Sequence, residues 1–155
     1  MQPIYIKTCG EFVLEGHVLP YDCYFIDNPA YNGTSQETFR KVLLRWASAL
    51  SRNTKNGQTL FFPFVPDDEW TEALKGTIDG DSIVLTRGIL GVPGFGIDFD
   101  NLEDFIVAPK GLTSTPASFT EVGASRSFSI RVDLDEFIQE LKNPCVIDGM
   151  GFDRK

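Results

Sequence analysis

The first half of the chain contains an apolar pattern of helical period. Large apolar residues recur there every three or four positions, at Phe39, Leu43, Trp46 and Leu50. This spacing puts them on one face of a helix. Thr34 and Glu37 have the spacing of a capping box, in which the two side chains accept backbone amides at the start of the helix. The pattern predicts a helix over residues 35–51, with Trp46 in the core.

Two more helices are predicted further along the chain. The longer one begins after Asp133, a good capping residue, and ends before Pro144. Its apolar face would consist of Leu134, Phe137, Ile138 and Leu141. A shorter helix around residues 102–106 is stopped by Pro109.

The other apolar segments are short or alternate with polar residues, as strands do. They cover residues 4–6, 12–14, 24–26, 60–65, 70–78, 82–90 and 128–132. Asp79 and Gly80 suit the positive φ angles of a tight hairpin turn, so the segments on either side of them should pair antiparallel. Pro63 cannot donate a ladder hydrogen bond, which places its strand at a sheet edge or a bulge. The glycine-rich run from Gly88 to Gly96 is typical of a flexible loop.

Together these elements predict an α+β fold in a single domain. Short links between the strands favour a mainly antiparallel, twisted β-sheet of about six strands, packed with two main helices and one short helix. A chain of 155 residues, 42% hydrophobic, supplies enough apolar surface for one such core. The domain is predicted to span residues 1–145, followed by a C-terminal tail over residues 146–155 that has few apolar anchors.

The charge of the chain narrows the classes of partner. Its formal value is −8 at pH 7, which repels nucleic acid and attracts basic proteins. No apolar run approaches the roughly 18 residues of a membrane span, and residues 1–7 lack the features of a secretory signal. We therefore expect a cytoplasmic protein that binds neither nucleic acid nor membranes directly.

Few residues suit catalysis. The single histidine, His17, lies among apolar neighbours, and no second histidine exists to activate any of the three cysteines. The cysteines also lack the spacing of a zinc site. Asp98 and Asp100 could hold a divalent cation, but the remaining ligand spacing of a calcium loop is missing. We expect no enzymatic activity, no metal and no cofactor.

Two acidic clusters are candidates for contact with a partner. The first consists of Asp98, Asp100, Glu103 and Asp104, and the second of Asp67, Asp68 and Glu69. Such a cluster is either a solvated face or a site that meets a basic partner. Trp70 adjoins the second cluster, and a tryptophan beside charge is typical of interface hot spots unless it begins a strand and lies in the core. The predicted helix at residues 35–51 also has a basic face, typical of a solvated surface, of Lys41, Arg45 and Arg52.

The order of elements resembles that of immunity proteins of bacterial contact-dependent growth inhibition systems. The likeness rests on the helix at residues 39–50 with the apolar strand after it, the hairpin at 70–90, the acidic segment 101–106, and the final strand and helix through Leu141. The resemblance implies a twisted antiparallel sheet with helices and no enzymatic activity. It also implies one-to-one binding to the C-terminal toxin domain of an exported effector, often a nuclease.

We therefore expect an immunity protein that binds and neutralises a basic toxin domain in the cytoplasm as a 1:1 heterodimer. The two acidic clusters and Trp70 are its predicted contact residues. Two alternatives stay open. One is a small-ligand or metal-dependent enzyme centred on Asp98 and Asp100, and the other is an accessory protein that assembles with copies of itself through the strand at residues 60–65.

Overall fold

The computed structural model describes residues 1–8, 10–22, 35–65, 70–91, 97–109, 118–121 and 128–147. These residues form three helices and nine strands, which confirms the predicted α+β class. The helices are α1 (Ser35–Ser51), α2 (Leu102–Val107) and α3 (Leu134–Lys142). The strands are β1 (Tyr5–Lys7), β2 (Glu11–Leu14), β3 (His17–Pro20), β4 (Thr59–Val65), β5 (Trp70–Asp79), β6 (Ser82–Gly91), β7 (Ser118–Glu121), β8 (Ser129–Asp133) and β9 (Cys145–Ile147).

All three helices lie where the sequence predicts them. α1 has the predicted bounds, and α2 is short and ends before Pro109. Asp133 caps α3, because its Oδ1 accepts a hydrogen bond from the backbone amide of Glu136 at 2.9 Å. Thr34, the predicted cap of α1, lies outside the described residues.

The strands form two sheets rather than the single predicted sheet. One has the order β3-β2-β1-β9 and the other the order β4-β5-β6-β7, with β8 also paired to β6. The β1–β9 pair is parallel and the other described pairs are antiparallel. The sequence does not predict β3, β7 and β9. Val146 and Ile147 of the predicted tail belong to β9, while the predicted strand at 24–26 lies outside the described residues.

The predicted hairpin is confirmed. β5 and β6 pair along their whole length, from Trp70 with Gly91 to Asp79 with Ser82. The turn residues are therefore Gly80 and Asp81, one position later than predicted. Gly80 has a φ of 62°, and a positive φ at the first turn position alone is the pattern of a type II′ turn, which favours glycine there.

Gly88 and Gly91 belong to β6 and not to a flexible loop, which corrects the prediction for this part of the glycine-rich run. The prediction failed because composition alone does not distinguish a strand glycine from a loop glycine. Gly88 is required for space: a Cβ there would lie 2.3 Å from Cζ of Phe119, whose ring crosses the glycine from β7. The rest of the run, residues 92–96, lies outside the described residues.

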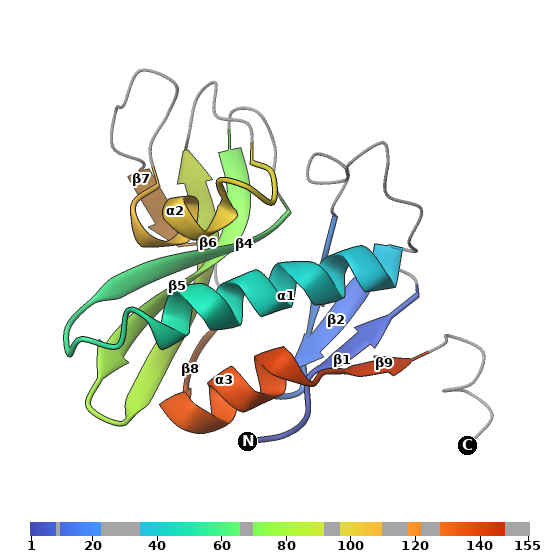
Figure 1. The fold of residues 1–155 in the computed structure, drawn as a ribbon, viewed down its shortest axis with the longest axis horizontal. Helices are drawn as coiled ribbons and strands as arrows, with labels where there is room; N and C mark the ends of the chain where they lie inside the picture. The colour runs from blue at the N-terminus through green and yellow to red at the C-terminus, as the bar shows by residue number, and fades with distance from the viewer. Residues whose placement is uncertain are drawn as a thin grey trace.

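The core forms where α1 meets both sheets. In Figure 1, α1 crosses in front of the strands, with α2 above it and α3 below. The ring of Trp46 in α1 lies 6.3 Å from that of Phe12 in β2 and 5.2 Å from that of Phe62 in β4, measured between centroids. One side chain of the helix therefore contacts both sheets. Trp46 is only 1% exposed, which confirms its predicted place in the core.

The edge of the second sheet lies at β4, as the proline predicts. The register of β4 against β5 also shifts between Pro63 and Val65, so the strand is both an edge and bulged. The backbone amide of Asp22, which follows β3, donates a hydrogen bond to the carbonyl oxygen of Phe64 at 2.9 Å. This bond connects the two sheets at the end of β4.

A buried ion pair joins β5 and β6. Nη2 and Nε of Arg87 both donate to Oε1 of Glu72, at 2.8 and 3.2 Å. The guanidinium also lies over the ring of Phe64, 5.7 Å from its centroid. The side chains of Arg87 and Glu72 are 10% and 8% exposed, so both charges of the pair are almost fully buried.

We predict that Arg87→Met lowers the free energy of unfolding by about 3–5 kcal/mol, because it removes the guanidinium that donates two hydrogen bonds to the buried Glu72 carboxylate. The double variant Glu72→Leu/Arg87→Met should lose less, since it removes the buried carboxylate together with the guanidinium. Arg131→Met removes the exposed pair with Asp79 and is the matched control, with an expected loss below about 1 kcal/mol. Urea unfolding measures all three, and a double variant less stable than Arg87→Met would contradict this account.

The amino terminus forms an ion pair with α3. The amino group of Met1 donates a hydrogen bond to Glu136, and this bond raises the pKa of the amino group above its ordinary value of 8.0. Desolvation opposes the shift, while the charges of Glu136, Glu15 and Glu140 add to it. The pair therefore attaches the start of the chain to the first turn of α3.

This pKa shift predicts a pH dependence of stability. A raised folded pKa means that the pair stabilises the fold fully below about pH 8 and loses that contribution as the pH rises through the folded pKa. We predict that Glu136→Gln lowers the melting temperature at pH 7 and that its difference from the unmodified protein shrinks as the pH rises above about 8. Thermal melts over this pH range test it, with Glu121→Gln as a control, and a difference that stays constant would be evidence against the pair.

Candidate functional site

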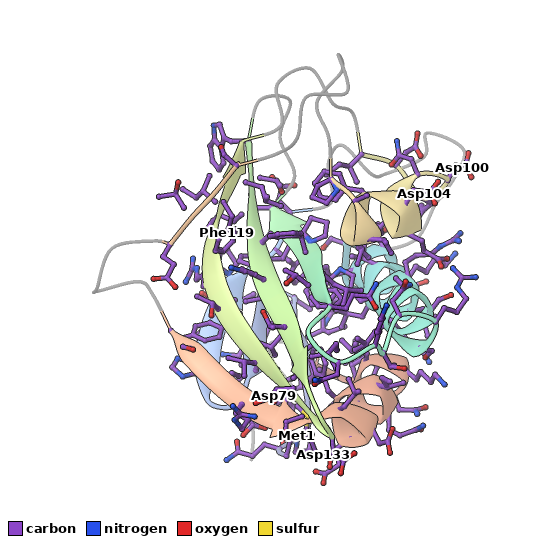
Figure 2. All side chains as sticks on the ribbon, turned by 90° about the vertical axis from the view of Figure 1, so that its left-hand side faces the viewer. Met1, Asp79, Asp100, Asp104, Phe119 and Asp133 are labelled. Atoms are coloured by element: carbon purple, nitrogen blue, oxygen red, sulfur yellow. The ribbon has the colours of Figure 1, made fainter. Side chains whose placement is uncertain are left out.

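α2 and the turn before it carry carboxylates at one end of the molecule. In Figure 1, α2 lies at the end where β6 finishes and β7 begins, away from the turn between β5 and β6. Figure 2 shows Asp100 and Asp104 at this end, and Asp79 and Asp133 at the opposite end. Asp98, Asp100 and Asp104 are all exposed. We call these three residues the acidic end.

Hydrogen bonds within the turn hold Asp98 in place. Its Oδ1 accepts from the backbone amides of Asp100 and Asn101, at 2.9 and 3.0 Å, while Oδ1 of Asn101 accepts from the amide of Asp98 at 2.9 Å. Aspartate and asparagine favour such turns because their short side chains reach the nearby backbone. The segment is anchored in the core by three buried side chains, those of Ile97, Leu102 and Phe105. The acidic end is therefore built on a defined backbone.

Glu103, the fourth residue of the predicted cluster, has a different role. Its carboxylate accepts a hydrogen bond from Oγ of Ser48 at 2.9 Å. It also forms ion pairs with Arg45, at 3.4 Å, and with Arg52. Its side chain is only 20% exposed. Glu103 thus joins α2 to α1 with its charge already neutralised, which corrects its grouping with the exposed acids.

The basic face of α1 is engaged in the same contact. Besides its pair with Glu103, Arg45 lies over the ring of Phe99, 5.8 Å from the centroid. The helical spacing of Arg45 and Arg52 suggested a solvated surface. Both side chains instead contact Glu103, and Arg45 also contacts Phe99. The sequence separates Glu103 from these arginines by some fifty positions, and no local pattern shows that they meet.

Trp70 is a surface residue although it begins a strand. It is 42% exposed, so the core alternative for this tryptophan is wrong. It pairs with Gly91, the last residue of β6, and therefore lies at the same end of the sheet as the start of β7. The neighbouring acidic cluster of Asp67, Asp68 and Glu69 lies outside the described residues.

A depression between the end of α1 and α2 is a feature without any signal in the sequence. Its volume is about 440 Å³, and it is lined by Arg52, Asn53, Glu103, Asp104, Val107 and Ala108. Val107 is 38% exposed there, so the wall combines an apolar surface with charged groups. The depression adjoins the acidic end through Asp104.

The other residues considered for chemistry have ordinary surroundings. His17 stacks on Phe128, with 4.5 Å between ring centroids, and Cys145 is a free, exposed thiol. In the part of the chain that the structure describes, no three histidine, cysteine or acidic side chains gather as a metal site would require. The same part contains no helix with the length and apolar character needed to cross a membrane.

The chemical character of the site lies in exposed charge and an exposed tryptophan. Comparison of the chain with protein-family models, curated proteins and solved structures finds no match.

We predict that Glu103→Gln lowers the free energy of unfolding by about 1–2 kcal/mol, because it removes the charge shared by two arginines and a serine. Asp104→Asn changes the adjacent exposed acid of the same helix and should alter stability by less than about 0.5 kcal/mol. Urea unfolding of the two variants measures the difference. Equal effects would mean that the contact of Glu103 with α1 does not hold α2.

Proposed function

We propose that the protein is an immunity protein that binds a basic toxin domain through its acidic end and covers the surface with which the toxin grips its substrate. The observation that carries the proposal is the placement of three exposed carboxylates and an exposed tryptophan at one end of the fold. A toxin that acts on nucleic acid must be basic where it contacts phosphate. The acidic end is complementary in charge to such a surface, and long-range attraction would speed the encounter.

Trp70 supplies a contact that charge alone lacks. Tryptophan is enriched at interface hot spots, because burying its large ring releases much water from apolar surface. The backbone of Trp70 pairs with Gly91 and 42% of the residue is exposed, so the ladder fixes where the ring leaves the sheet while part of it stays accessible to a partner. A side chain that is already ordered loses little entropy on binding.

The two alternatives have less support. Assembly through the edge of β4 would need free backbone groups along that strand, but the carbonyl oxygen of Phe64 already accepts the amide of Asp22. An enzyme centred on Asp98 and Asp100 would need an enclosed site, and both carboxylates face solvent from a turn. The exposed acids favour recognition of another protein surface.

The test begins with affinity capture of the partner from the source organism, followed by expression of its toxin domain in cells with and without this protein. We expect restored growth, a 1:1 complex of the purified proteins, and an affinity that falls as salt screens the charges. Asp98→Asn/Asp100→Lys/Asp104→Lys should weaken the complex by at least about tenfold and abolish protection. Asparagine is chosen at position 98 because it can still accept the hydrogen bonds of the turn.

A matched control separates the acidic end from net charge. Glu121→Gln/Asp81→Lys/Asp135→Lys makes the same change in formal charge on exposed residues of other elements. It should retain protection and most of the affinity. Equal losses of affinity in the two triple variants would mean that overall charge alone causes the effect. Full protection by Asp98→Asn/Asp100→Lys/Asp104→Lys would mean that the acidic end is not part of the interface.

A further inference from the structure

We further propose that the depression between α1 and α2 receives an arginine side chain of the partner, at the place where Arg52 now contacts Glu103. The identity of the partner rests on the proposed function, but the site can be tested without it. The volume of about 440 Å³ lies within the range of pockets that hold ligands.

The carboxylate of Glu103 is already arranged to meet a guanidinium. Ser48 donates to its Oε1, and Arg45 pairs with its Oε2 while lying over the ring of Phe99. These contacts fix the carboxylate from the side of α1. A carboxylate fixed in advance binds a guanidinium with little further ordering.

Arg52 marks the position of the incoming group. Its guanidinium contacts Oε1 of Glu103, and its side chain is 66% exposed, against 43% for Arg45. An ion pair with so exposed a partner contributes little to stability. An arginine from outside can therefore replace Arg52 and leave Glu103 with the same number of ion pairs.

The walls of the depression favour arginine over lysine. Asp104 adds a second carboxylate at the rim, and Val107 and Ala108 offer apolar surface to the methylene groups of a long side chain. The planar guanidinium can bridge two carboxylates, whereas an ammonium acts as a point charge.

The test uses N-acetyl-arginine methylamide, titrated into isotope-labelled protein and followed by amide chemical shifts, with the lysine analogue for comparison. We expect saturable shifts at Asn53, Glu103 and Val107, and a response to the lysine compound at least about threefold weaker. Arg52→Gln vacates the site and should tighten binding of the arginine compound by up to about fivefold. Arg40→Gln removes the same charge elsewhere on α1 and should leave the affinity unchanged.

A second variant blocks the site without touching its charges. Ala108→Phe should fill the depression and abolish the saturable shifts, while the fold persists because Ala108 is exposed and lies beyond the end of α2. Equal, non-saturating shifts with both compounds, or unchanged shifts in Ala108→Phe, would overturn the proposal. A protein that binds the arginine compound but protects no cell from a toxin keeps this site and loses the proposed function. A protein that protects cells but does not respond to the arginine compound keeps the proposed function and loses this site.

Discussion

The structure depends on one constraint: two small sheets share a single helix as their common core. The four-stranded sheet cannot bury its apolar face alone, and neither can the five-stranded sheet beside it. Trp46 meets this requirement by contacting Phe12 of one sheet and Phe62 of the other. α2 and α3 then pack against α1, so the direction of α1 sets the position of both. The acidic end is consequently positioned by a helix that contributes none of its exposed carboxylates.

The negative charge of the chain is divided among several structural roles. Glu72 is buried with Arg87, Glu103 joins two helices, and Glu136 holds the amino terminus. Asp98 shapes a turn while its charge stays exposed. The 22 acidic residues of the chain therefore overstate how many carboxylates are available to a partner. What supports a binding role is the placement of Asp98, Asp100 and Asp104 at the same end of the fold as an exposed tryptophan, rather than the total.

Much of the fold follows from local patterns, and less of the site does. The helices and the long hairpin are predictable because amphipathic period, caps and turn residues act within a few positions. The short strands β7 and β9 are formed by pairing with distant segments, so their own residues carry little signal. For the same reason Glu103 looks like its acidic neighbours in sequence, although Arg45 and Arg52 neutralise it. Exposure of Trp70 likewise depends on what covers the strand end, which no local pattern specifies.

The parallel pairing of β1 with β9 has a consequence for how the chain folds. Tyr5 pairs with Cys145, so this edge of the first sheet closes only after residues 145–147 have been synthesised. Contacts between residues so distant in sequence carry a large entropy of loop closure and slow the search for the native state. Until then, the outer edge of β1 stays open to other strands in the nascent protein. A toxin present during that interval would meet a protein whose acidic end is synthesised but whose framework is not yet complete.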